Sequence, residues 1–135
     1  MQPAVRRPSP GSFLLASRAF AIATLGVVIA LFCTAGAMIQ SQQLKDIHGV
    51  AAIALHVVTA GLTLALGGLA FSRERGWWAA GLAGALFVFT FAQAYLGEGT
   101  TLAIHIPGAM AVVASAVWLT AWVFSAAPAA IPATP

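Results

Sequence analysis

Charge is the property that this sequence has least of. Only 7% of its 135 residues are charged, whereas an average soluble domain has about a quarter. At the same time 61% of the residues are hydrophobic, and the mean hydropathy is +0.95. A chain with so little polar surface is not an ordinary soluble domain, and its composition predicts the lipid bilayer as its solvent.

Cysteine and clusters of basic residues are also nearly absent. Cys33 is the single cysteine, which excludes a disulfide framework. Its apolar neighbours in the sequence predict a buried position. The net charge of +3 comes from six basic and three acidic residues, but the basic residues occupy short separate segments and form no stripe. We therefore expect no nucleic-acid binding.

Four long apolar runs organise the chain. They cover about residues 19–39, 47–71, 77–96 and 102–124. As a helix the first run would be about 32 Å long, which is enough to cross the hydrocarbon core. The connections are short and favour antiparallel neighbours. The sequence therefore predicts an all-α, integral membrane four-helix up-down bundle over residues 13–125. Disordered tails rich in Pro, Ala and Ser are expected at residues 1–12 and 126–135.

The basic residues predict the orientation of this bundle. Five of them lie before the first run or between the second and third, and Lys45 alone lies on the other side. The positive-inside rule then makes both termini cytoplasmic, and we expect a multi-pass protein of the plasma membrane of a bacterial cell. Trp77, Trp78 and Trp122 would lie at the inner interface and Tyr95 at the outer one. A cleavable signal peptide in place of the first helix is the alternative, since "TAGA" resembles a cleavage site.

Two of the three histidines open predicted helices. His48 begins the second helix and His105 begins the fourth, so both imidazoles would lie at a similar depth near the outer face. In a four-helix ring the second and fourth helices are diagonal to each other. Ionisable residues in a membrane span indicate function, and a macrocycle with axial nitrogen ligands on both faces needs this arrangement. We predict that His48 and His105 bind the iron of a haem.

Small side chains share the helix faces of these two histidines, at about 100° per residue. They leave room for a flat ligand, but they also suit close helix packing. The predicted haem-binding positions beside the histidines are Ala52, Thr59, Gly108, Ala109 and Val112. His56 lies about 12 Å deeper with no histidine at its depth, so we leave it out of the iron ligands and expect it to be hydrogen-bonded. Hydrogen bonds between helices are expected from Thr59, Thr63, Thr90 and Gln93.

Two segments resemble one half of haem A synthase, namely "DIHGVAAIALHVVTAGL" and "FAQAYLGEGTTLAIHIPGAM". That family joins two similar four-helix bundles, each with a His opening its second helix, a Q-x-x-L-G element ending its third and a His opening its fourth. The matching residues here are His48, Gln93 with Leu96 and Gly97, and His105. The resemblance covers about residues 19–124, and the chain is similar also to small four-span bacterial membrane proteins with the same His pattern. It implies a haem b held by His48 and His105 near the outer leaflet.

The chain also departs from that family. Gly49 follows His48 where the family has Arg, and Asp46 stands two residues before His48 where the family has a carboxylate about a turn earlier. One bundle is present in place of two. We therefore do not expect the oxidation of a haem methyl group or a stand-alone enzyme, and we assign no catalytic residue.

The predicted function is electron transfer or haem handling by a membrane-embedded bis-histidine cytochrome. Its expected partners are the lipid bilayer and either a second copy of the chain or a larger respiratory or oxidoreductase complex. The main alternative is a haem-free accessory or scaffolding subunit. A small transporter or proton relay that uses His48, His56 and Glu98 is a third, and few other polar groups in the apolar runs support it.

Overall fold

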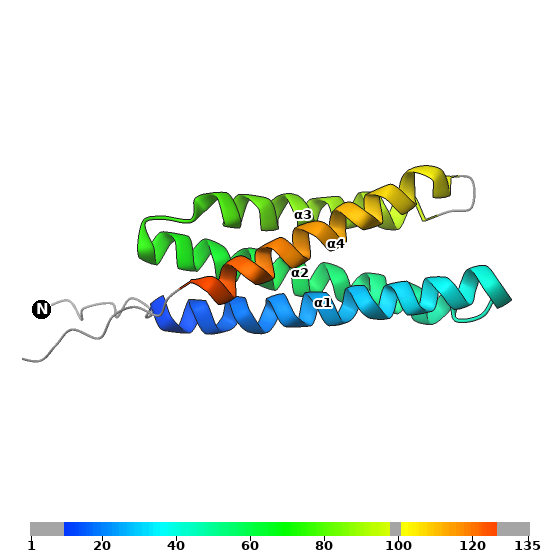
Figure 1. Ribbon diagram of the computed structural model, residues 1–135, viewed down its shortest axis with the longest axis horizontal. Coiled ribbons are helices and arrows are strands. Elements are labelled where there is room, and N and C mark those ends of the chain that lie inside the picture. Colours follow the sequence, from blue (N-terminus) through cyan, green and yellow to red (C-terminus); the bar gives the residue numbers. More distant parts are fainter. Residues whose placement is uncertain (1–9, 98–100, 127–135) are drawn as a thin grey trace, which may run out of the picture.

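The computed structural model describes residues 10–97 and 101–126, which form four α-helices (Figure 1). They are α1 (Pro10–Ser41), α2 (Lys45–Arg73), α3 (Trp77–Tyr95) and α4 (Leu102–Ser125). Each is long and apolar enough to cross a membrane, which supports the predicted helical bundle of a multi-pass membrane protein. The predicted tails fall largely outside the described residues, at 1–9 and 127–135.

The first two helices are longer than the apolar runs that predicted them. α1 begins at Pro10, so the last three residues of the predicted N-terminal tail form its first turn. Proline suits that position because the first N–H groups of a helix have no partner within the helix. α2 includes Lys45 and Asp46, and the carboxylate of Asp46 is favourable near a helix N-terminus. Polar residues thus extend both helices beyond their apolar parts.

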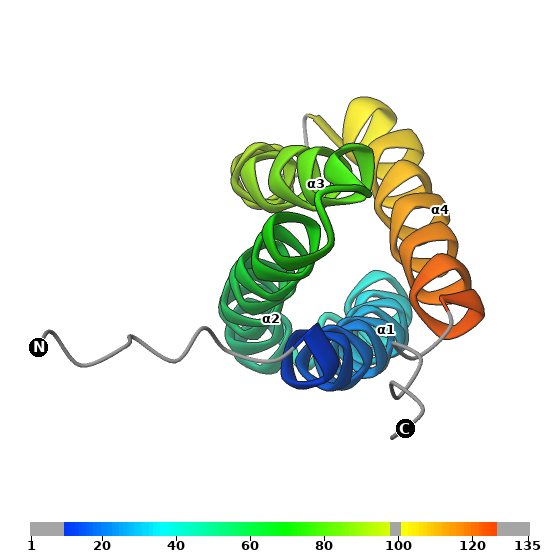
Figure 2. The same cartoon turned by 90° about the vertical axis from the view of Figure 1, so that its left-hand side faces the viewer.

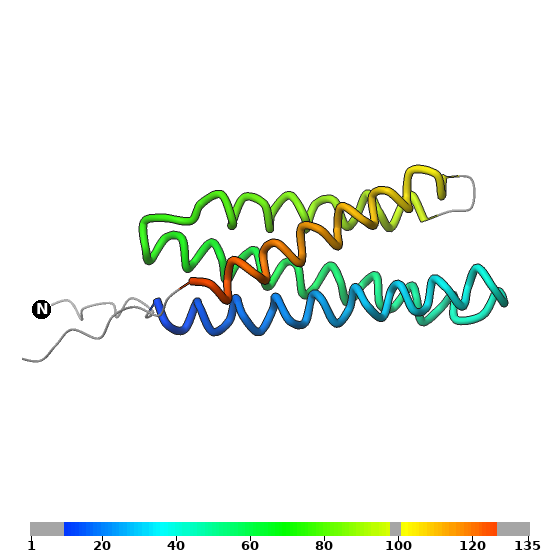
Figure 3. The backbone as a smooth tube through the Cα atoms, viewed as in Figure 1, coloured from blue at the N-terminus to red at the C-terminus, as the bar shows by residue number. Residues whose placement is uncertain are grey.

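The four helices form a ring. α1 packs against α2 and α4, and α3 packs against the same two helices (Figure 2). Among the described residues the diagonal pairs, α1 with α3 and α2 with α4, share no close backbone contact. This confirms the predicted diagonal placement of α2 and α4. The first residue of α1 and the last of α4 lie at the same end of the bundle, and α4 approaches α1 toward that end (Figures 1 and 3).

The packing of α2 on α1 depends on two glycines. A Cβ atom added at Gly61 would overlap the ring of Phe20, and one added at Gly68 would overlap the ring of Phe13. The two contacts are one heptad apart on both helices and run in opposite directions, as antiparallel packing requires. Small residues at such an interface let two helix backbones approach closely. These contacts set the register of α2 against α1.

A narrow stripe of each helix faces the interior, and the rest is exposed. The largest fully buried apolar side chains are Leu62, Leu66, Leu69, Leu119 and Val123. The exposed surface carries many large apolar side chains, such as Ile29, Val57 and Trp118, which suits a lipid environment. Cys33 is exposed, so its predicted burial is wrong, because the buried stripe of α1 passes through Val28 and Thr34 and leaves Cys33 on the outer side.

Candidate functional site

His48 and His105 lie at the same end of the bundle, opposite the end where α1 begins. His48 is in the first turn of α2 and His105 is in the first turn of α4, and both side chains are half-buried. Because α2 and α4 are diagonal in the ring, the two histidines belong to opposite corners of the bundle. The structure therefore places His48 and His105, which the sequence predicts to act as a pair, at the same end of the bundle.

The His105 ring is anchored to the end of α3. Its Nδ1 atom lies 3.0 Å from the backbone oxygen of Gln93. That oxygen is available because α3 ends at Tyr95, and the Gly97 N–H bonds to the oxygen of Ala94 instead. A carbonyl oxygen can only accept, so a neutral His105 carries its proton on Nδ1 and its lone pair on Nε2. Histidines that bind metals are held in this way by a partner on their other nitrogen.

Pro107 shapes the turn that carries His105. It lies inside α4, which begins at Leu102, and it has no N–H to donate to the oxygen of Ala103. The start of α4 therefore lacks one regular backbone hydrogen bond, the one that would span His105. Thr101 occupies the N-cap position, and its hydroxyl donates to the oxygen of Leu96 at 2.6 Å. That bond ties the start of α4 to the end of α3 beside His105.

The His48 ring is anchored to α1. Its Nδ1 atom lies 2.9 Å from Oγ1 of Thr34. The same hydroxyl lies 2.8 Å from the oxygen of Ala30 and 3.0 Å from that of Leu31. When the single hydroxyl proton is donated to either carbonyl, Thr34 accepts from Nδ1–H of His48 and the lone pair of His48 is on Nε2. Thr34 was not among the predicted site residues.

The interior beneath the two imidazoles is apolar. Their helices, α2 and α4, are not in contact with each other among the described residues. Two turns deeper on the same faces are Leu55 and Val112, which are 6% and 5% exposed and belong to one apolar core. Apolar side chains of α2 and α4 therefore lie in the interior below the histidines.

The other predicted haem-binding positions differ in their surroundings. Thr59 and Val112 are buried, and Ala52, Gly108 and Ala109 are half-buried. Gly108 receives the side-chain amide of Gln93, since a Cβ atom there would overlap that amide. Gln93 is 6% exposed, and neither its Nε2 nor its Oε1 has a hydrogen-bond partner among the described residues. One residue of α3 thus anchors His105 through its backbone and places an unpaired amide against α4.

The expected hydrogen bonds between helices are mostly wrong. Thr59, Thr63 and Thr90 donate to carbonyls of their own helices, at 2.7, 2.8 and 2.6 Å, as hydroxyls inside helices commonly do. His56 also differs from the prediction, because its Nδ1 atom is buried without a partner among the described residues. Its ring packs on Phe91 of α3 instead, with ring centroids 4.0 Å apart. Glu98 lies outside the described residues.

No family model, curated protein or solved structure matches the chain. The resemblance to haem A synthase therefore rests on the sequence motifs alone. Within residues 10–97 and 101–126, no group of three or more His, Cys, Asp or Glu side chains could hold a metal ion. The arrangement at His48 and His105 offers two imidazole nitrogens, a donor set that suits a metal whose remaining ligands belong to a cofactor.

Proposed function

We propose that this chain is a membrane-embedded b-type cytochrome whose haem iron is bound by His48 and His105, and that it serves electron transfer or haem handling. The observation that carries the proposal is the matched anchoring of the two rings. Each imidazole uses Nδ1 for a bond to a neighbouring helix, which leaves Nε2 for a ligand. Two histidines on diagonal helices at one end of a bundle are also the placement that a haem held between two imidazoles requires.

The residues around the histidines fit a haem in their chemistry. Leu55 and Val112 supply an apolar floor, and the unpaired amide of Gln93 offers both a donor and an acceptor beside His105. A bound haem would supply one-electron chemistry at a potential set by its axial ligands and their surroundings. The chain itself would orient the two imidazoles through Thr34 and the Gln93 carbonyl and exclude water from below. If His48 and His105 both held the iron, no position would be left for oxygen or substrate, and the haem would serve electron transfer.

The orientation of the bundle is part of the proposal. The positive-inside rule places both termini in the cytoplasm and the histidines near the outer leaflet, in the plasma membrane of a bacterium. The exposed apolar surface of each helix is compatible with lipid or with a neighbouring membrane protein. A homodimer, which would rebuild a two-bundle architecture, or a larger oxidoreductase complex would supply the redox partner.

A visible spectrum of the purified protein tests the proposal. The protein, expressed in a haem-replete host, should show a Soret band and should develop sharp α and β bands when dithionite reduces it. His48→Ala and His105→Ala should each lose the low-spin spectrum, and added imidazole should restore part of it. His56→Ala is the matched control and should keep the spectrum, because its ring packs on Phe91.

A haem-free accessory subunit is the outcome that would overturn this proposal. It would give a colourless protein that also fails to bind added hemin. In that case His48→Ala and His105→Ala would change the stability of the bundle only through the lost contacts with Thr34 and Gln93. The absence of a spectral change in either variant of a coloured protein would instead exclude that residue as an iron ligand.

A further inference from the structure

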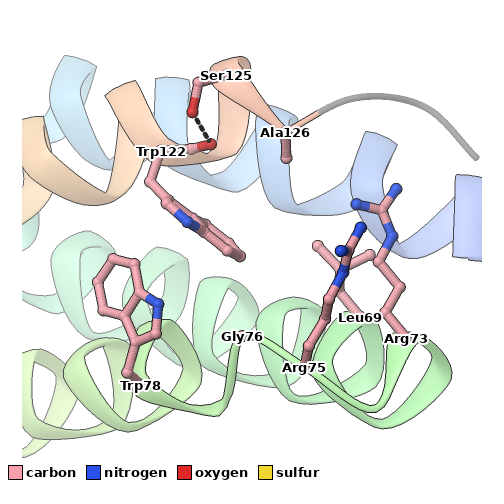
Figure 4. A pocket seen from close by; sticks show the side chains of 8 residues that line it. All are labelled: Leu69, Arg73, Arg75, Gly76, Trp78, Trp122, Ser125 and Ala126. Carbon is pink, nitrogen blue, oxygen red and sulfur yellow. Dashed lines mark hydrogen bonds between the residues drawn. The ribbon is translucent and has the colours of Figure 1, made fainter.

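A cavity of about 350 Å³ lies at the opposite end of the bundle from the histidines (Figure 4). Its lining residues are Leu69, Arg73, Arg75, Gly76, Trp78, Trp122, Ser125 and Ala126. Among the residues that the structure describes, the lining thus contains two guanidinium groups and two indoles but no carboxylate. Glu74, between the two arginines in the sequence, is exposed and does not line the cavity. This composition favours an anionic ligand.

The two indoles form one wall of the cavity. Trp78 and Trp122 pack edge to face, with ring centroids 5.3 Å apart and an angle of 74° between the ring planes. Gly76, which has a φ of 86°, brings the turn between α2 and α3 close to this wall. A Cβ atom at Gly76 would lie 3.1 Å from the Trp122 ring. The wall is therefore held from α3, α4 and the turn together.

A third arginine, Arg18, binds the backbone oxygens at the end of α4 beside the cavity. Arg18 of α1 donates to the backbone oxygens of Val123 and Ala126, at 3.4 and 3.2 Å, and its guanidinium lies 5.3 Å from the centre of the Phe124 ring. The last carbonyls of a helix carry partial negative charge, which would repel an anion. By bonding to them, Arg18 offsets that charge beside the cavity and holds α4 in place.

We infer that this cavity binds the phosphate of an anionic phospholipid headgroup, with Arg73 and Arg75 as its ligands. Guanidinium groups bind phosphate through paired hydrogen bonds, and basic pockets between helices at the cytoplasmic side of a membrane commonly hold anionic headgroups. A lipid is favoured over free phosphate because exposed apolar side chains stand within two residues of the lining residues in the sequence and suit acyl chains: Phe71 is 66% exposed, Trp77 56% and Phe124 49%. The inference does not depend on haem.

Lipid titrations of the purified full chain in dodecyl maltoside test this site. Dioleoylphosphatidylglycerol should bind more tightly than dioleoylphosphatidylcholine, measured by native mass spectrometry or by the rise in the thermal midpoint. The double variant Arg73→Gln/Arg75→Gln should weaken phosphatidylglycerol binding by roughly tenfold or more, because hydrogen bonds to charged groups are lost. Lys45→Gln is the control for charge, since Lys45 begins α2 at the other end of the bundle.

A variant that keeps both arginines separates a defined site from general attraction. Ser125→Phe places a large side chain at a residue that lines the cavity and should weaken phosphatidylglycerol binding although no charge is removed. Unchanged binding in Ser125→Phe, or an equal loss in Lys45→Gln, would overturn the proposal. Inorganic phosphate that binds as tightly as the lipid and displaces it would overturn the lipid as the source of the anion. If the double variant does not fold, Ser125→Phe and Arg75→Lys, which keeps the charge without the paired donors, decide the question.

Discussion

Thr34→Val removes the hydroxyl group that contacts Nδ1 of His48 at 2.9 Å and keeps the shape of the side chain. Thr34 is 7% exposed, so water does not readily replace the hydroxyl. Without it the imidazole has lost the partner that fixes its orientation and its tautomer. Under the proposed function, the variant should bind haem more weakly than the natural protein.

The size of this effect follows from the role of the contact. A neutral hydrogen bond contributes about 0.5–1.5 kcal/mol to folding, whereas removing the partner of a metal-binding histidine typically lowers affinity about 10–100-fold. Such a change in affinity corresponds to about 1.4–2.8 kcal/mol. We therefore expect haem affinity to fall by roughly 10–100-fold while the protein still folds.

Thr24→Val is a closely matched control. Thr24 lies on the same helix, is 0% exposed and donates to the oxygen of Phe20 at 2.8 Å, just as Thr34 donates to the oxygen of Ala30 at 2.8 Å. Both variants lose a bond of the same kind within α1. The difference between them therefore isolates the contact with His48.

The assay is a titration of hemin into the apoprotein in detergent, followed by the Soret absorbance. Thr34→Ser, which keeps the hydroxyl, should retain most of the affinity. Equal haem affinity in Thr34→Val and Thr24→Val would refute the reasoning, because the hydroxyl would then have no part in presenting His48.

Three further variants test the packing that surrounds the site. Gly108→Ala makes a Cβ atom overlap the Gln93 amide and should lower the free energy of unfolding by about 1–3 kcal/mol. Adding Gln93→Ala to the same chain should recover most of this loss. No recovery would contradict the contact between Gln93 and Gly108. Gly61→Ala should lower the free energy of unfolding by a similar amount, whereas Gly26→Ala, with nothing within 4 Å of its added Cβ atom, should raise it by up to about 1 kcal/mol. Denaturant or thermal unfolding in detergent measures both variants. Equal effects would argue against the packing of Phe20 on Gly61. His56→Phe keeps the aromatic contact and removes a buried, unpaired Nδ1 atom, so the thermal midpoint should rise by the equivalent of about 1 kcal/mol; a fall would show that the nitrogen has a partner.

The sequence was sufficient to predict the four helices and the level of the two histidines. Long uncharged runs and short connections leave few alternatives in a bilayer, and a helix whose first turn contains His48 or His105 presents it at one end of the bundle. The ends of α1 and α2 were predicted less well, because polar residues continue a helix past its apolar part without a change in periodicity.

The partners of the histidines could not be predicted from the sequence. The Gln93 oxygen is a backbone atom, and it is available because α3 ends two residues later. No side chain in the sequence indicates that α3 ends there. Thr34 is one of several threonines in the apolar helices, and its place opposite His48 depends on the register of α1 against α2. The threonine hydroxyls were expected to bond between helices, but their own helix carbonyls lie closer.

The packing of Phe13 and Phe20 on two glycines has a consequence for how this chain can change. Phe20 precedes Thr34 by two heptads, a rise of about 21 Å along α1, and the glycine contacts fix one end of that interval. A residue inserted between them would shift Thr34 by about 1.5 Å and turn it by about 100°, away from His48. The exposed residues of this interval can vary in identity, but a change in its length would separate Thr34 from His48.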